Sequence, residues 1–281
     1  MSKAKQVIRD SQFRYKKGLG QNFLYDEALL EELVNASGVT KEDSVLEIGP
    51  GSGSMTALLA TKCKQVTALE LDEALLPILR VTLAAHSNVK VIHGDVLKSD
   101  LLEITAPLGK QFCVVANIPY YITSPLLTLL LSDKLSIRLL AVMIQKEVAD
   151  KIMAKPGADE YGMLAVRAQY YCEPSLARIV PAEAFTPPPK VDSAFMVLPF
   201  LPKPAVEVIN EDIFFRMAGA AFLMRRKTML NNLQSSFSMT REDAVKLLLA
   251  CGLDERVRGE TLTLSTFAAL ANAYETLKQG V

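Results

Sequence analysis

The stretch "VLEIGPGSGSMTALLA", residues 45–60, decides the fold of this 281-residue chain. A short apolar run ends at Gly49, glycines recur at alternate positions as far as Gly53, and a helix-like segment follows them. Glycine is needed where a backbone turns tightly and approaches a ligand without a Cβ in the way. A strand, a glycine-rich turn and a helix in this order are typical of the ligand-binding end of an α/β sheet.

Apolar runs and helix-like segments alternate outward from this stretch, between Ser44 and about Phe200. The runs of strand length are "SVLEIG" (44–49), "QVTALEL" (65–71), "VKVIHGD" (89–95), "FCVVAN" (112–117) and "LLAVMIQ" (139–145). This alternation predicts an α/β fold with a mostly parallel, doubly wound, Rossmann-like sheet. Two further runs, 167–180 and 193–200, follow each other without a helix between them, and we expect them to add antiparallel strands at the sheet edge.

The proline-rich segment 198–208 is the expected linker, because its prolines cannot continue a helix. We therefore expect one domain over residues 1–202 and a small all-α domain over residues 203–281. Three amphipathic helices are predicted in the second domain, over 211–237, 240–253 and 264–279. Thr240, with Asp243 three residues later, is a plausible start for the second of them.

Charge is balanced overall but unevenly distributed. Residues 1–20 hold six basic side chains against one acidic one, and residues 213–240 hold four basic side chains and no acidic one. Two basic regions on an otherwise acidic chain favour a polyanionic partner that is touched at particular places. Solvated lysines on a terminus would give the same pattern.

Half of the residues are hydrophobic, which suits a globular protein with one large core and a smaller appended domain. The N-terminal residues lack the apolar core of a signal peptide, and no apolar run approaches the roughly 18 residues of a membrane span. We therefore expect a cytoplasmic protein with no membrane partner.

Cysteine and histidine are too sparse and too scattered for a metal centre or a disulfide framework. Only two histidines are present, and the cysteines contain no Cys-x-x-Cys pair. We expect no metal, and we expect the cysteines to be small buried hydrophobes. They are Cys63, Cys113, Cys172 and Cys251.

Acidic residues stand at the next two predicted strand ends. Glu70 lies 21 positions after Gly49, where a carboxylate can accept from both ribose hydroxyls, and Asp95 can accept from an adenine amine. The spacing Gly-x-Gly-x-Gly departs from the dinucleotide fingerprint, which places its third small residue at Ser54, and Pro50 stiffens the loop. The turn therefore favours S-adenosylmethionine, which has no phosphates to bind, over a dinucleotide.

The fourth strand ends in "ANIPYY", residues 116–121. The exocyclic amine of adenine is a poor nucleophile until both of its N–H groups are held by acceptors, which the Asn117 side chain and the Ile118 carbonyl can supply. Pro119 would fix this turn, and Tyr120 would stack on the base. An Asn-x-Pro turn that merely closes a strand fits the same residues, but its place on the fourth strand favours catalysis. No role follows for Tyr121, which we expect to pack behind Tyr120.

The sequence that carries these motifs resembles the KsgA/RsmA-type ribosomal RNA adenine dimethyltransferases, to which the Erm and Dim-type enzymes are related. The resemblance covers nearly the whole chain. It rests on "KKGLGQNFL" (16–24), "VLEIGPGSG" (45–53), "ALELDE" (68–73), "HGDVL" (93–97), "NIPYY" (117–121), "QKEVADKI" (145–152), "FTPPPKVDSA" (185–194) and "RRKTMLNNL" (225–233).

The resemblance implies a class I S-adenosylmethionine-dependent methyltransferase fold and a role for each matching residue. A basic N-terminal segment, residues 1–25, would close over the cofactor through Asn22 and Leu24. Gly49 and Gly51 would lie under its methionine part, and Glu70 and Asp95 would hold the ribose and the adenine. Asn117 would contact both the cofactor and the target amine.

Three further matches concern the RNA. Tyr120 and Phe185 would sandwich the target adenine. Arg225, Arg226 and Lys227, on a helix of the C-terminal domain, would contact rRNA phosphates.

The activity implied is dimethylation of two adjacent adenosines in a hairpin loop near the 3′ end of small-subunit (16S) rRNA. The substrate would be a pre-ribosomal 30S particle, the enzyme a monomer, and the by-product S-adenosylhomocysteine. Two alternatives stay open: an Erm-type methyltransferase of 23S rRNA that gives antibiotic resistance, and a non-catalytic RNA-binding factor for ribosome assembly. The forms of "RRKTMLNNL" and "FTPPPKVDSA" favour the first function over the Erm type, and the complete set of cofactor residues argues against a purely binding role.

Overall fold

The chain folds into two compact units in the computed structural model, which describes residues 3–132 and 134–279. The first unit comprises the described residues up to Ala149 together with Glu173–Phe200, and the second comprises Asp150–Cys172 and the described residues from Leu201 onward. This division differs from the expected boundary at residue 202, because segment 150–172 belongs to the second unit. Tyr170 explains the difference: its ring stacks on Phe214 with a centroid distance of 4.7 Å.

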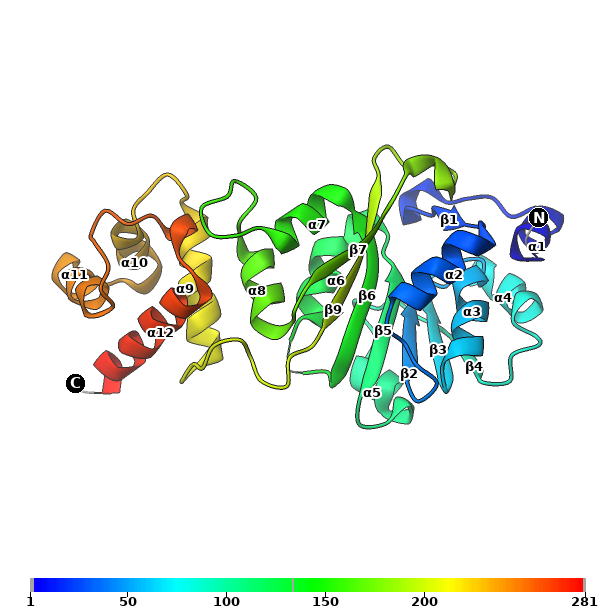
Figure 1. Ribbon diagram of the computed structural model, residues 1–281, viewed down its shortest axis with the longest axis horizontal. Coiled ribbons are helices and arrows are strands. Elements are labelled where there is room, and N and C mark those ends of the chain that lie inside the picture. The colour runs from blue at the N-terminus through cyan, green and yellow to red at the C-terminus, as the bar shows by residue number, and fades with distance from the viewer. Residues whose placement is uncertain (1–2, 133, 280–281) are drawn as a thin grey trace. The chain divides into compact units, whose positions relative to one another are not determined.

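The core of the first unit is a sheet with the order β4-β3-β2-β5-β6-β9-β7 (Figure 1). Pairing is parallel from β4 to β6, and β9 pairs antiparallel with both β6 and β7. The predicted mostly parallel sheet with antiparallel strands at its edge is therefore confirmed. The strands are β2 (Ser44–Ile48), β3 (Gln65–Glu70), β4 (Val89–His93), β5 (Phe112–Asn117), β6 (Ile137–Gln145), β7 (Ser175–Val180) and β9 (Ser193–Pro199).

Helices cover the sheet, and α2 and α3 pack against one face of it (Figure 1). Leu33 of α2 and Leu59 of α3 join a core with Val45 and Cys113, and all four side chains are fully buried. Strands buried on both faces read as nearly continuous apolar runs, which is why the sequence pattern found them. The helices up to residue 153 are α1 (Lys3–Asp10), α2 (Glu27–Ala36), α3 (Ser54–Lys62), α4 (Leu76–Thr82), α5 (Leu101–Thr105), α6 (Thr123–Leu130) and α7 (Lys146–Met153).

Strand β2 is the point where the direction of winding changes. The chain proceeds from β2 to β3 on one side of it, whereas β5 occupies the other side. In open α/β sheets, ligands bind beyond the carboxyl ends of the strands at such a switch point. Gly49 directly follows β2 and Asn117 ends β5, so the expected site lies where the topology alone predicts one.

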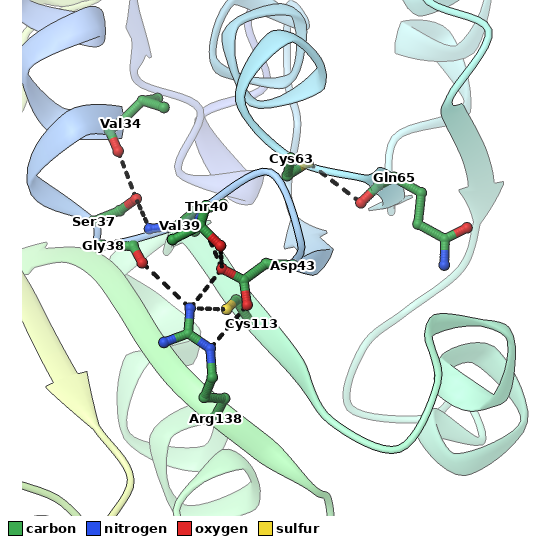
Figure 2. Close-up of polar contacts among 10 residues, drawn as sticks. All are labelled: Val34, Ser37, Gly38, Val39, Thr40, Asp43, Cys63, Gln65, Cys113 and Arg138. Carbon is green, nitrogen blue, oxygen red and sulfur yellow. Dashed lines mark hydrogen bonds and ion pairs between the residues drawn. The ribbon is translucent and has the colours of Figure 1, made fainter.

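An ion pair between Arg138 and Asp43 lies at the amino ends of the central strands β6 and β2 (Figure 2). Two guanidinium nitrogens of Arg138 donate to the two carboxylate oxygens at 2.8 and 2.7 Å, and one of them also lies 3.3 Å from the Gly38 carbonyl oxygen and 3.1 Å from the sulfur of Cys113. Burial by itself would raise the pKa of Asp43, but the bonds from Arg138 and Thr40 outweigh it and lower that pKa. The cluster attaches the turn after α2 to strands β5 and β6.

The second unit contains α8 (Met163–Tyr171), α9 (Glu211–Leu223), α10 (Met229–Phe237), α11 (Arg241–Ala250) and α12 (Leu264–Gln279) (Figure 1). Thr240 caps α11, as expected, because its side chain accepts from the Asp243 N–H at 3.1 Å. Two expectations were wrong. Residues 167–171 belong to α8 and not to a strand, and the single helix predicted over 211–237 is divided into α9 and α10.

The division follows from contacts at Thr228, which sequence periodicity does not register. Its side chain caps α10, and its backbone forms an isolated bridge with Arg258. The N–H of Met229 also donates to the Val257 carbonyl at 2.8 Å, away from the preceding turn. A backbone that pairs with another segment cannot continue α9.

Cys63, Cys113 and Cys172 are buried, as expected, and Cys251 is partly exposed. Burial raises the pKa of the Cys113 thiol to about 12. Within residues 3–132 and 134–279, no helix is long and apolar enough to cross a membrane. The same residues contain no cluster of three or more side chains suited to a metal ion.

Candidate active site

A cleft opens at the carboxyl ends of the parallel strands of the first unit. Its walls come from residues 19–23, from the ends of β2 to β5, and from Phe185. The cavity volume of the cleft is about 190 Å³. Every expected cofactor and catalytic residue lines this cleft except Leu24.

The glycine-rich turn after β2 forms the floor of the cleft. Gly49 and Gly51 have φ values of +71° and +57°, which L side chains rarely adopt. A Cβ on Gly51 would also lie 2.9 Å from the ring of Phe23, so only glycine fits between the turn and the N-terminal segment.

Glu70 presents an oriented carboxylate to the cleft, although only 5% of its surface is exposed. One oxygen accepts from the Gly51 N–H at 3.1 Å and the other from the Asp72 N–H at 2.7 Å. Burial raises the pKa of Glu70, while these two backbone donors oppose the rise. Each carboxylate oxygen has a second acceptor site, so the group can still accept hydroxyl protons from a ribose.

Asp95 stands in the loop after β4 and also lines the cleft. Its carboxylate accepts from the Leu97 N–H at 3.0 Å and lies 3.3 Å from the Lys98 ammonium. These contacts fix the loop 94–97, whose backbone and apolar side chains form one wall. A carboxylate held in this way can accept from an exocyclic amine.

Asn117 ends β5 and is joined to the N-terminal segment. Its amide nitrogen donates to the Asn22 carbonyl at 3.0 Å. The amide oxygen of Asn117 can only accept, so this bond determines which end of the amide is available to a substrate amine. Asn22 in turn donates from its own amide to the Gly20 carbonyl at 3.1 Å, and this bond stabilises the turn that forms the cleft wall.

Two tyrosines follow Pro119 in a 3₁₀ turn, Tyr120–Ile122. The Tyr120 hydroxyl lies 2.8 Å from the hydroxyl of Ser193, a fully buried residue at the start of β9. Tyr121 is 53% exposed and lines the cleft, so the expectation that it packs behind Tyr120 was wrong.

Phe185 lines the cleft from a second, two-stranded sheet. Strand β8 (Phe185–Thr186) pairs antiparallel with β1 (Phe23–Leu24), and Leu24 lies opposite Phe185. Phe185 is only 3% exposed, and Leu24 is a core residue whose side chain does not line the main cleft. The small sheet therefore connects the N-terminal segment to the expected base-stacking wall through backbone bonds.

Charge in the cleft has one sign. Glu70 and Asp95 are the ionisable acids of its lining, and no lysine or arginine occurs among the described residues that line it. A dinucleotide or nucleoside triphosphate would place several negative charges there without a partner. A cationic ligand with an adenosine group suits the lining much better.

Sequence reasoning missed the contacts that hold the N-terminal segment beside the cleft. Lys16 and Gln21 both bond to Asp72, which lies two residues after Glu70. The motifs "KKGLGQNFL" and "ALELDE" contain these residues, but nothing in either motif indicates that they meet.

Arg225, Arg226 and Lys227 lie in the second unit and are exposed. We expected these residues on a helix, but they occupy the turn between α9 and α10. A turn at the start of a helix still suits phosphate contacts, because the helix dipole adds to the positive charge.

Comparison with known proteins agrees with this geometry. A family model described as ribosomal RNA adenine dimethylase matches residues 12–274. Ribosomal RNA small subunit methyltransferase A of Shouchella clausii (strain KSM-K16) is 46% identical over 279 residues, covering 97% of this chain and 94% of the relative. The protein of the same name from Bacillus mycoides (strain KBAB4) is 45% identical over 278 residues, covering 97% and 95%.

Two solved structures share the fold. A dimethyladenosine transferase from Plasmodium falciparum is similar with a TM-score of 0.77 at 24% identity, covering 92% of this chain and 98% of the other. The 23S rRNA methyltransferase ErmE is similar with a TM-score of 0.69 at 26% identity, covering 90% and 100%. Since the family model spans most of the sequence and the curated relatives match nearly all of it, the chain belongs to the ribosomal RNA adenine dimethylase family.

Proposed function

We propose that this protein transfers methyl groups from S-adenosylmethionine to the exocyclic amines of two adjacent adenosines near the 3′ end of small-subunit rRNA. The curated relatives at 45–46% identity are named as small-subunit enzymes and cover 97% of the chain, which favours this substrate over 23S rRNA. The similarity to ErmE is weaker in sequence and supports the fold and the class of reaction.

One observation supports the cofactor assignment above the others. The cleft combines two carboxylates with an Asn amide at the switch point of the sheet and has no basic side chain among its described lining residues. S-adenosylmethionine is a cationic adenosine derivative without phosphates and fits this lining. When bound, it supplies the methyl group that the adenine amine takes up, and S-adenosylhomocysteine leaves.

Some residues of the cleft would bind the cofactor and others the target adenine. Glu70 would bind the ribose, Asp95 the adenine, and Gly49 and Gly51 would let the methionine part approach the backbone. The Asn117 oxygen and the Ile118 carbonyl would accept the two N–H bonds of the target amine, which makes its lone pair more available. Because a methylated adenine ammonium is acidic enough to lose its proton to water, no general base is needed.

The Pro119 carbonyl already accepts from the Ile122 N–H at 3.1 Å, and this bond stabilises the turn that carries Ile118 and Tyr120. Tyr120 would stack on the target base with its hydroxyl bonded to Ser193. Phe185 lines the same cleft from β8 and would form the second wall of the sandwich.

The second unit would supply the RNA contacts through Arg225, Arg226 and Lys227. We further propose that the enzyme acts as a monomer on a pre-ribosomal 30S particle in the cytoplasm. The name of the relatives as small-subunit enzymes supports small-subunit RNA as the substrate in this proposal.

Transfer of radiolabelled methyl groups to unmethylated small subunits, followed by nucleoside analysis, tests the proposal. We expect dimethyladenosine in small-subunit RNA and no label in large subunits from a strain that lacks the corresponding 23S modification. Label in large subunits alone would support the Erm-type alternative. Binding to small subunits without any label would support the non-catalytic assembly factor.

A further inference from the structure

Asp72 has an unusual environment for a residue outside the expected binding set. Only 2% of its surface is exposed, yet three donors converge on its carboxylate. The Lys16 ammonium lies 2.6 Å from one oxygen and the Gln21 amide nitrogen lies 2.7 Å from the other. The Ala74 N–H adds a bond of 3.1 Å that caps the turn after β3.

The backbone of Asp72 is bonded to the ribose-binding carboxylate. Its N–H donates to Glu70 at 2.7 Å, and the other oxygen of Glu70 accepts from Gly51. A continuous chain of hydrogen bonds therefore runs from Lys16 through Asp72 and Glu70 to the glycine-rich turn. A change in the position of Asp72 must alter the orientation of Glu70.

The segment between these contacts forms part of the cleft. Residues 19–23 line it, and their far end is held where Asn117 donates to the Asn22 carbonyl. The segment is thus fastened on both sides of the cleft, at Asp72 beside the ribose site and at Asn117 beside the expected methyl-transfer site. The side chain of Phe23 also packs against Gly51, which brings the segment onto the floor of the cleft.

Because Asp72 is buried, its ionised carboxylate depends on the bond from Lys16. An ionised carboxylate out of water is stable only when charged or strongly polar donors satisfy it. Burial would raise the pKa of Asp72, but the bonds from Lys16 and Gln21 outweigh this and lower that pKa. The Lys16 side chain is half-exposed, so it can leave the carboxylate without disrupting a core.

We propose that Asp72 is a positioning residue that receives Lys16 and Gln21 as a two-point latch, docks residues 16–23 over the cofactor and orients Glu70. The inference rests on the proposed function, because it assumes that the cleft takes S-adenosylmethionine. The latch acts on binding of the cofactor and not on the transfer step, since neither Lys16 nor Gln21 carries a reacting atom.

Binding of S-adenosylhomocysteine, measured by calorimetry without RNA, tests the latch with Lys16→Met and Asp72→Asn. Lys16→Met should weaken binding about three- to tenfold, because it removes one charge-assisted bond from a partly exposed pair. Asp72→Asn should weaken binding about tenfold or more. Lys16→Arg, which keeps the positive charge, should retain most of the binding that Lys16→Met loses. Lys64→Met is the matched control, because Lys64 is exposed and lies at the amino end of β3, away from the cleft. This variant should bind S-adenosylhomocysteine as the wild type does.

Two further readouts separate a latch from a general loss of structure. Amide hydrogen exchange without cofactor should become faster at residues 16–23 in Lys16→Met and stay unchanged in the strands. In methyl transfer, KM for S-adenosylmethionine should rise, while kcat at saturating cofactor stays within about twofold of the wild type.

A double-mutant cycle completes the test. Lys16→Met combined with Asp72→Asn should be no worse than Asp72→Asn alone, within about twofold, since the two act through one contact. Unchanged binding in Lys16→Met, or additive losses in the double variant, would overturn the latch. If the wild type itself does not bind S-adenosylhomocysteine, the proposed cofactor is wrong, which is a different outcome.

Discussion

Asn117 combines a structural role and a proposed chemical role in the two ends of one amide. Its nitrogen donates to the Asn22 carbonyl at 3.0 Å, and its oxygen remains the acceptor proposed for the adenine amine. Replacement by another polar residue would disturb one of the two roles. An aspartate, for example, would bring an acceptor to face the Asn22 carbonyl.

We predict that Asn117→Ala lowers kcat by at least about 10²-fold, because a preorganised acceptor at the reacting amine is lost. RNA binding should survive, since the variant leaves the second unit intact. Single-turnover methyl transfer and a filter-binding assay on the same preparation measure the two effects. Asn35→Ala, an exposed position of α2, is the control. Turnover close to that of the wild type in Asn117→Ala would refute its assignment.

Glu47 is a second residue with an identifiable role, although not in catalysis. It lies in the centre of β2 with 2% exposure, and one of its carboxylate oxygens has no hydrogen-bond partner among the described residues. Burial, aided by the nearby charge of Glu70, raises the pKa of Glu47 to about 8. The folded protein therefore holds this carboxyl in its protonated form near neutral pH.

The sign of the resulting pH dependence follows from linkage. An acid whose pKa is raised by folding stabilises the native state fully below its unfolded pKa of about 4.3, and this contribution is lost as pH rises through the folded value. We predict that Glu47→Gln, which stays neutral, gains on the order of 2–4 kcal/mol relative to the wild type between pH 5 and pH 9. Urea unfolding at both pH values measures the difference, and parallel curves for the two proteins would contradict it.

At the scale of elements, the 3₁₀ turn Gly259–Thr261 packs closely against α9 within the second unit. A Cβ on Gly259 would lie 2.4 Å from the Ala221 Cβ and 2.6 Å from its Cα. Backbone atoms of a helix cannot yield by rotating a side chain. The turn can approach α9 this closely only because residue 259 is glycine.

We predict that Gly259→Ala destabilises the protein by about 2–4 kcal/mol, because the added methyl group forces the turn away from α9. Gly219→Ala on the same helix is the matched control, since a Cβ there meets no atom within 4 Å. Alanine has the higher helix propensity, so the control should be neutral or more stable by up to about 1 kcal/mol. Thermal or urea unfolding of both variants checks the contrast, and equal stabilities would show that the turn can shift.

Elements differ in how well the sequence predicts them. The parallel strands and the cap of α11 were expected correctly, because apolar runs and capping residues act within a few positions of the chain. The break between α9 and α10 was missed, since it depends on the pairing of Thr228 with Arg258, thirty positions away. Residues 167–171 were wrongly assigned to a strand, because their helical conformation also depends on distant residues. The ring of Tyr170 packs on Phe214 and Phe215 of α9.

At the scale of the whole molecule, the net charge is zero, but acidic and basic side chains gather in different places. The cofactor cleft carries carboxylates without a basic residue in its described lining, whereas three adjacent cations occupy one exposed turn of the second unit. Each unit thereby carries charge opposite in sign to its proposed ligand, which is a cationic cofactor in one case and RNA phosphates in the other.

We predict that replacing Arg225, Arg226 and Lys227 by glutamine weakens RNA binding and flattens its dependence on salt. The slope of log K against log salt should fall by about 0.7–0.9 for each phosphate contact that is lost. Binding titrations with the rRNA hairpin between 50 and 200 mM salt measure it, as roughly the range in which such contacts matter. Lys203→Gln, an exposed cation of the same unit, is the control. An unchanged slope would place the RNA surface elsewhere.

The amino-acid sequence by itself determined the succession of the parallel strands, the carboxyl ends of those strands as the place of the candidate site, and the family. Each of these depends on local information: the period of apolar residues, glycines at a turn, and motifs whose residues are adjacent in the chain. Glu70, Asp95 and Asn117 were expected to lie close together because parallel strands end at one edge, and all three line the cleft.

Only the tertiary structure decided which side chains meet across that edge. Lys16 bonds to Asp72 across 56 positions, and Asn117 to the Asn22 carbonyl across 95. The bond of Tyr120 to Ser193, the exposure of Tyr121, and the burial of Phe185 in one core with Leu24 likewise depend on strand register and turn geometry. Such contacts follow from the packed arrangement of many elements at once, and no period or motif in a single segment specifies them.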